Sequence, residues 1–137
     1  MRFELATPGR LLVSTEADEV VAPGTEGYFG VLPGHAAFLS TLGSGRLTYR
    51  RGGEENHLAV MGGFAEVGPD RMIVLAEGAE RPQEIDRERA ERARQRAEQR
   101  LAGKSARGEE DIDYARAVAA LGRAFARLQA AAPAGGG

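Results

Sequence analysis

The chain has 137 residues, long enough for one modest domain or for a small domain with an appendage. Its net charge of −2 gives no general case for a nucleic-acid partner. The absence of cysteine excludes disulfides and thiolate metal sites, and two histidines, His35 and His57, cannot make a zinc site unaided. We therefore expect neither a metal centre nor a nucleic-acid interface.

The sequence also carries no membrane or export signal. No apolar run approaches the roughly 20 residues that span a bilayer, and the segment "MRFELATPGR" lacks a secretory apolar core. We expect a cytosolic protein without direct membrane insertion, which reaches a membrane only through a partner.

Residues 1–82 have the pattern of strands. Short apolar or alternating segments are separated by Gly and Pro at spacings near ten residues, as in a sandwich or barrel. The segments are "RFELA", "RLLVSTE", "DEVVAP", "YFGVL", "GRLTYRR", "NHLAVMGGFAEV" and "RMIVLAE". Turn chemistry places hairpins at Gly52-Gly53 and at Gly68-Pro69-Asp70. We predict an antiparallel β-sandwich.

From about residue 85 the apolar period becomes helical. We predict one helix over residues 84–102 and a second over 112–131, with a break at "GKSARGEED" and a disordered tail over 132–137. The expected fold class is thus α+β, with a sandwich domain over 1–82 and an antiparallel two-helix hairpin over 83–131.

The second predicted helix has two apolar faces. One is bulky and the other is small, so we expect the small face to pack on alanines of the first helix and the bulky face to meet the sandwich. The bulky face consists of Val118, Leu121, Phe125 and Leu128. The small face consists of Ala115, Ala119, Gly122 and Ala126, opposite Ala90, Ala93 and Ala97. Each buried methyl contributes only about 0.8 kcal/mol, so a seam of alanines would dock the first helix weakly and let the hairpin move.

Three arginines of the second helix lie on one stripe. Arg116, Arg123 and Arg127 fall within about 40° of each other at 100° per residue. A solvated basic face explains such a stripe, and so does a phosphate or carboxylate ligand, whose oxygens match the guanidinium fork. Near the start of the first helix, Asp86 is either a plain first-turn acid or, with Arg89, part of the same anion site. Both interpretations remain open at this level.

No catalytic constellation accompanies these residues. His35 lies between Pro33-Gly34 and an apolar run, but no Ser, Cys or Asp motif supports it as a base, and we interpret this stretch as an apolar contact loop. The sequence contains no GxxxxGK[ST] phosphate loop. A bound nucleotide would therefore be sensed and not hydrolysed, and we expect no catalytic residue and no catalytic cofactor.

Several segments together, and in this order, resemble the epsilon subunit of bacterial F-type ATP synthase. They are "GYFGVLPGHAAFL", "AVMGGFAEV", "RMIVLAEGAER" and "EIDRERA", followed by "DIDYARAVAALGRAFARL". The likeness covers roughly residues 2–130. "IDRERA" fits the adenine-nucleotide motif of that family, Ile/Leu-Asp-x-x-Arg-Ala.

The resemblance implies a sandwich of about ten strands and a mobile helical hairpin in a non-catalytic rotor subunit. Its partners would be the gamma subunit and the c-ring, and the alpha/beta head when the hairpin extends to block ATP hydrolysis. It would lie peripherally on the cytoplasmic face of the bacterial plasma membrane, coupling proton flow to rotation. The implied rotor contacts are Glu26, Gly27, Tyr28, Phe29, Val31, Leu32, Pro33, Gly34 and His35.

The resemblance also implies that ATP is a regulatory ligand of the compact hairpin. The matching motif positions are Ile85, Asp86, Arg89, Arg123 and Arg127, with Glu80 and Arg116 as further candidates. Two other classes of protein fit the residues: a free-standing nucleotide-sensing module, and a sandwich adaptor whose helices dimerise and whose arginines bind no ligand.

Overall fold

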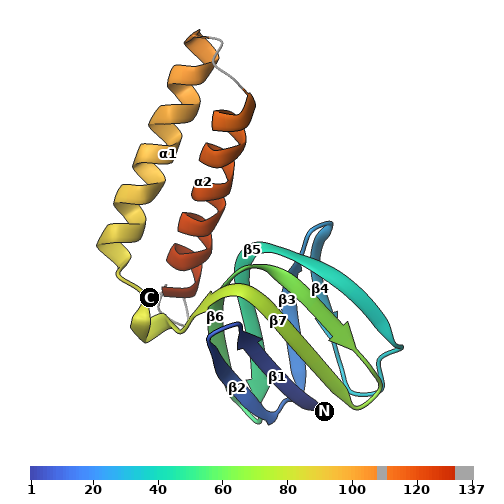
Figure 1. Cartoon of the computed structure of the whole chain (residues 1–137). Helices are drawn as coiled ribbons and strands as arrows, with labels where there is room; N and C mark the ends of the chain where they lie inside the picture. Colours follow the sequence, from blue (N-terminus) through green and yellow to red (C-terminus); the bar gives the residue numbers. More distant parts are fainter. Residues whose placement is uncertain (108–110, 132–137) are drawn as a thin grey trace.

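The computed structural model describes residues 1–107 and 111–131, and within them a strand-rich half is followed by two long helices (Figure 1). The strands are β1 (Arg2–Thr7), β2 (Arg10–Glu16), β3 (Glu19–Gly24), β4 (Gly27–Val31), β5 (Phe38–Arg51), β6 (Glu54–Val67) and β7 (Arg71–Glu80). The helices are a 3-10 turn η1 (Pro82–Glu84), α1 (Arg87–Arg107) and α2 (Asp111–Ala131). The predicted order of a β domain and a helical hairpin is confirmed, and the predicted tail over 132–137 lies outside the described residues.

The strands form one hydrogen-bonded sheet in the order β2-β1-β7-β6-β5-β3-β4. The pairs are antiparallel except for β1 and β7, which run parallel. β5 and β6 are 14 residues long each and bend strongly, so the sheet folds over on itself and its two layers enclose one core (Figure 1). The described residues hold seven strands and not about ten, because β5 and β6 each run through both layers.

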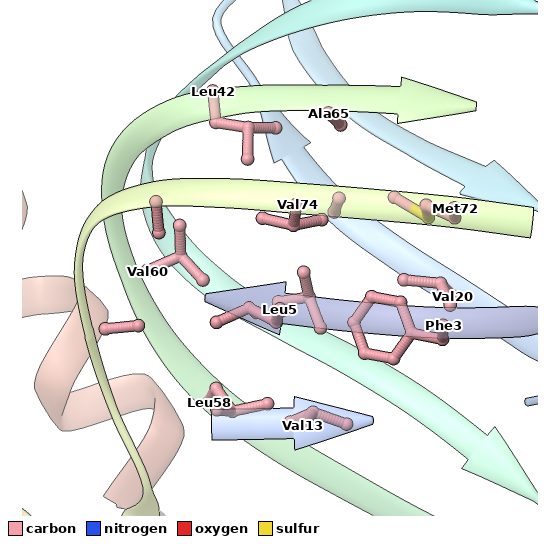
Figure 2. Packing of buried hydrophobic residues seen from close by; sticks show 14 of the residues in the cluster. Phe3, Leu5, Val13, Val20, Leu42, Leu58, Val60, Ala65, Met72 and Val74 are labelled. Atoms are coloured by element: carbon pink, nitrogen blue, oxygen red, sulfur yellow. The ribbon is translucent and has the colours of Figure 1, made fainter. Parts of the chain in front are cut away.

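The core between the layers is built from alternate residues of the strands. Phe3, Leu5, Leu47, Leu58 and Val74 are at most 2% exposed. Figure 2 shows Phe3 and Leu5 of β1 among side chains from β2, β3, β5, β6 and β7. This burial follows the alternating pattern of a β-strand, in which every second side chain points into the core.

One glycine makes the bend of β6 possible. Gly63 has φ +130°, and a Cβ atom there would lie 2.7 Å from Cα of Ala76 on β7, closer than real Cβ contacts allow. The strands approach so closely at this point that only a residue without a side chain fits.

The hairpin meets the sandwich through α2, whereas α1 packs on α2 (Figure 1). Ala126 and Ala130 are buried against Ala59 and Met61 of β6, with Ile85 at the edge of the cluster. One turn before Ala126, Gly122 lies over Ser44 of β5. Gly122 and Ala126 of the small face therefore contact the sandwich, whereas Ala115 and Ala119 are exposed, and the prediction that this face packs on α1 is wrong.

The opposite face of α2 carries the contact with α1. Ala117 and Ala124 are at most 1% exposed, and at 100° per residue they lie opposite the small face. Their counterparts on α1 are the buried Ala90 and Ala97. Two members of the bulky face, Val118 and Phe125, are 45% and 44% exposed, because at 100° per residue they lie between the face that meets the sandwich and the face that meets α1.

Candidate functional site: a charged cleft at the base of the hairpin

The linker between the two halves is tied to the sandwich. Arg10 of β2 donates from Nη1 and Nη2 to the Glu84 carboxylate at 2.6 and 2.9 Å, across 74 residues of sequence. Glu84 also accepts from the Arg81 backbone N–H at 2.8 Å, and the Arg81 guanidinium donates to Leu12 O at 2.9 Å. These contacts fix η1 on the edge strand before the chain enters α1.

Asp86 caps α1. Its Oδ1 accepts from the backbone N–H of Arg89 at 3.0 Å, and its carbonyl accepts from the N–H of Ala90 at 3.0 Å. An aspartate in this position satisfies an otherwise orphaned helix donor and complements the positive end of the helix dipole. The capping interpretation of Asp86 therefore holds in this structure, and it leaves Oδ2 available for another partner.

Two contacts join the last turns of α2 to the sandwich. The guanidinium of Arg127 pairs with the carboxylate of Glu80 at the end of β7, with both side chains about one-third exposed. Arg46 of β5 donates to the carbonyl of Gln129 at 3.5 Å. The carbonyls at the end of a helix lack intrahelical partners, so Arg46 supplies a cation where the helix dipole favours one.

These elements enclose a cleft of about 300 Å³ between the linker, α1 and α2. It is lined by Glu80, Glu84, Asp86, Arg89, Ala90, Ala93, Arg96 and Arg127. Three guanidinium groups and three carboxyl groups thus share one space. The hydrogen bonds from Arg10 and from the Arg81 backbone lower the pKa of Glu84 to about 2, so this carboxylate is ionised at neutral pH.

The cleft holds four of the seven residues predicted for nucleotide binding: Glu80, Asp86, Arg89 and Arg127. Ile85 lies beside it in the apolar cluster under α2. Arg123 lines a neighbouring pocket of about 390 Å³ that also contains Glu77, and Arg116 is exposed on α2 and lines neither of these two pockets.

The sequence interpretation missed two arginines and one acid of this region. Arg96 follows Arg89 by seven residues, which is two helical turns, and this spacing could have identified it. Glu84 and its partner Arg10 are separated by 74 residues, and no local pattern connects them.

The predicted rotor-contact loop spans β4 and the turn after it. Tyr28 is 56% exposed, and its hydroxyl accepts from the Arg46 backbone N–H at 3.1 Å. Phe29 packs edge-on against Phe38 at 5.2 Å, and Val31 is completely buried in the core. Glu26 is exposed in the turn before β4, and Gly27, the exposed first residue of β4, has φ +128°. Val31 therefore supports this loop from inside the domain.

The second part of the loop is an ordered turn. Leu32 is 54% exposed, and Pro33 is also exposed. The N–H of Gly34 donates to Pro69 O at 2.6 Å, and the N–H of His35 donates to Leu32 O at 3.1 Å. The ring Nδ1 of His35 lies 2.7 Å from Ala36 O and the ring packs against Phe38 at 5.4 Å. In the part of the chain that the structure describes, the His35 ring contacts backbone and an aromatic neighbour, and no acid orients it as a general base would require.

His57 has a different environment on β6. Its Nδ1 lies 2.8 Å from the Thr48 hydroxyl, and its Nε2 lies 3.9 Å from Glu55. Burial, followed by the charge of Arg46, lowers the pKa of His57 below its usual value, and Glu55 opposes this only in part. In residues 1–107 and 111–131, no group of three or more acid or histidine side chains is arranged to hold a metal ion, and no helix could cross a membrane.

The fold and the cleft together define a class of protein: a β-sandwich that carries an ion-paired helical hairpin, without a catalytic constellation among the described side chains. Comparison with known families then identifies the family. The ATP synthase delta/epsilon chain beta-sandwich domain matches residues 1–82, and the long alpha-helix domain of the same chain matches residues 83–132. The chain belongs to the ATP synthase delta/epsilon chain family.

Relatives and solved structures agree over nearly the whole length. The ATP synthase epsilon chain of Nitratidesulfovibrio vulgaris is 50% identical over 129 residues, covering 94% of this chain and 93% of that one. The ATP synthase epsilon chain of Moorella thermoacetica is 49% identical over 132 residues, covering 96% of both chains. A chain of the Euglena gracilis mitochondrial ATP synthase structure, which contains OSCP, F1 and the c-ring, matches with a TM-score of 0.77 and 26% identity over 94% of this chain and 79% of that chain. The resemblance seen in the sequence is confirmed, and the chain is a non-catalytic ATP synthase subunit.

Proposed function

We propose that this chain is the central-stalk subunit that joins the c-ring to the gamma subunit and couples proton flow to rotation. The observation that carries the proposal is the Euglena match, because that chain comes from an assembly of F1 with a c-ring and its fold covers both the sandwich and the hairpin. The subunit would lie peripherally at the cytoplasmic face of the bacterial plasma membrane, held there by its partners.

The sandwich would meet the rotor through the loop over residues 26–35. Tyr28 and Leu32 support this proposal, because both are more than half exposed, Tyr28 on β4 and Leu32 in the following turn, whose backbone is hydrogen-bonded to the sandwich. Exposed aromatic and aliphatic side chains on a fixed backbone lose little entropy on binding and bury apolar area.

A pull-down from membranes tests this assignment. Leu32→Asp should reduce recovery of gamma and c subunits, because a charge would enter an apolar contact. Tyr114→Asp is the matched control, since Tyr114 is 53% exposed on α2 and outside the loop. Equal recovery with both variants would contradict the loop assignment. Failure of the unmodified chain to recover either subunit would instead favour a free-standing sensor or adaptor.

We further propose that the charged cleft binds ATP and that ATP keeps the hairpin compact. Asp86 would accept from the adenine amino group through its free oxygen, and Arg89 and Arg127 would meet the phosphates. Arg123 and Arg116 would approach from farther along the same stripe, with Glu80 and Ile85 at the base. Since Glu80 pairs with Arg127 in this structure, a bound phosphate would replace Glu80 as the partner of Arg127.

Such binding would select one arrangement of the hairpin. A ligand of the compact form alone stabilises it by RT ln(1 + [ATP]/Kd), about 2.7 kcal/mol at a hundredfold excess over Kd. The contacts that hold α1 are alanine contacts with α2, so a term of this size would decide whether the hairpin stays compact. Without ATP, the helices would extend toward the alpha/beta head and block hydrolysis.

Calorimetry with ATP tests the cleft, and the cap on α1 dictates the variants. Asp86→Ala removes both the cap and the acid, whereas Asp86→Ser keeps a capping oxygen and removes only the acid. If the cleft is the ATP site, both variants should bind ATP more weakly than the unmodified chain. Arg127→Ala should bind ATP more weakly than either of them. If Asp86→Ser binds like the unmodified chain, Asp86 is a cap and not a ligand. Absence of binding at millimolar ATP would remove the sensing role altogether.

A further inference from the structure

We propose that Arg10, on β2 of the sandwich, is a positioning residue of the nucleotide cleft: its pairing with Glu84 keeps that carboxylate from repelling the phosphates of a bound nucleotide. The inference rests on the proposed binding of ATP in the cleft and adds a residue from the other domain to it. Arg10 itself does not line the cleft, so its role would be indirect.

The geometry singles out this pair among the ion pairs of the linker. Both terminal nitrogens of Arg10 bind the Glu84 carboxylate, and Nη2 also lies 3.4 Å from Ala79 O. The pKa of Arg10 is raised first by the hydrogen bond to Glu84, and the charge of Glu80 adds to the effect. One guanidinium on the sandwich therefore binds one of the three acids that line the cleft and is influenced by the charge of a second.

The charge balance of the cleft depends on this outside cation. The lining side chains alone carry three positive and three negative charges, so they do not favour an anion. Arg10 makes the local sum positive, and its bidentate contact orients Glu84 toward β2. Without Arg10, Glu84 would keep only the longer ion pair with the Arg81 guanidinium, at 3.8 Å, and would present a poorly neutralised carboxylate to the space in which phosphates would bind.

An electrostatic role and a purely structural role of the Arg10–Glu84 pair predict opposite changes in ATP affinity for the variant Glu84→Gln. If Arg10 and Glu84 only hold η1 in place, removing either side chain loosens the linker and weakens binding. If Arg10 neutralises Glu84, then Glu84→Gln strengthens binding, because glutamine keeps an acceptor for the Arg81 N–H while the negative charge disappears. The double variant Arg10→Ala/Glu84→Gln then recovers what Arg10→Ala loses.

The experiment is calorimetric titration of the full-length chain with ATP at low and high salt. We expect Arg10→Ala to weaken binding roughly fivefold, the scale of one unit charge acting through a high dielectric within several ångströms. We expect Glu84→Gln to bind at least as tightly as the unmodified chain and the double variant to return to within about twofold of it. The effect of Arg10→Ala should shrink as salt is added, because exposed charges are screened.

Arg51→Ala is the matched control, since Arg51 is another sandwich arginine that bonds across strands, to the Thr15 hydroxyl. It should leave ATP affinity unchanged. If the unmodified chain binds ATP but Glu84→Gln weakens binding as much as Arg10→Ala does, the pair is structural and the inference is overturned while the proposed function stands. If the unmodified chain binds no ATP, both are overturned.

Discussion

Gly122 offers a direct test of how α2 lies on the sandwich. Glycine in a helix interior costs about 1 kcal/mol relative to alanine. A Cβ atom at Gly122 would lie 3.6 Å from Cβ of Ser44, which is ordinary van der Waals contact. Gly122→Ala should therefore stabilise the chain by the propensity term plus a fraction of the roughly 0.8 kcal/mol of a buried methyl group. We expect a gain of about 1–1.5 kcal/mol.

The gain should be measured by urea unfolding and by amide exchange of α2. In a chain of this size it corresponds to a rise of about 3–5 °C in Tm. Gly103→Ala is the control, because Gly103 lies inside α1 and a Cβ there would meet no atom within 4 Å. The control should show the propensity term alone. A loss of stability in Gly122→Ala would refute the reasoning, since it would mean that the helix and β5 are closer than van der Waals contact with alanine permits.

Three further perturbations follow from single contacts. Gly63→Ala should destabilise the chain by about 3 kcal/mol or more in denaturant titration, because Gly63 has φ +130° and lies against the β7 backbone. The control Gly53→Ala should cost little stability, because the space around Gly53 is open. The pKa of His57 is lowered in the folded chain, so the unfolded chain binds this proton more readily. The free energy of unfolding should therefore fall as pH drops from about 6.5 through the folded pKa. This pH dependence should vanish in His57→Gln and persist in the control His35→Gln. Glu80 and Arg127 should show a coupling of roughly 0.5–1 kcal/mol in a double-mutant cycle that decreases with salt, and an additive cycle would mean that the pair does not latch the hairpin.

The sequence was sufficient to predict the helices, strands and turns that are determined by neighbouring residues. The change from short apolar runs to a helical period located the start of the hairpin within a few residues of α1. Both glycine-containing turns lie where their chemistry placed them, with Arg51 pairing Glu54 across the first and Val67 pairing Met72 across the second. The predicted end of the first helix at 102 was five residues short of Arg107, because the residues after Gly103 continue the helix despite the break expected there.

The faces of α2 could not be assigned from its periodicity. Periodicity shows that two apolar stripes exist, but either can face either partner. The choice depends on what the sheet presents, and Ser44, Ala59 and Gly62 leave room for a close approach by small residues. The expectation that bulky residues face the larger domain fails here because the helix and sheet backbones lie close together, and small side chains are enough to fill the space between them.

The candidate site was predictable in part for a similar reason. Asp86, Arg89 and Arg127 could be connected because Asp86 and Arg89 mark the start of one helix and Arg127 lies on the other, and the structure places all three around one cleft. Arg10 could not be connected, since it reaches Glu84 only because β1 pairs with β2 on one side and with β7, which leads into the linker, on the other. Contacts between distant segments carry no periodic signal and appear only when the strand order is known.

The Arg10–Glu84 pair also bears on where the chain can be cut to separate the sandwich from the helical hairpin. The expected domain of residues 1–82 omits Glu84, although Glu84 binds β2 through Arg10 and caps the Arg81 N–H. From Asp86 onward the chain belongs to α1, which packs on α2. We therefore expect a fragment of residues 1–85 to fold alone with a higher thermal midpoint than a fragment of residues 1–82. The difference should disappear when both fragments carry Arg10→Ala, because the added residues then lose their bidentate partner. Equal midpoints with Arg10 intact would show that η1 moves with the helices, and the hinge of the hairpin would then lie before Pro82.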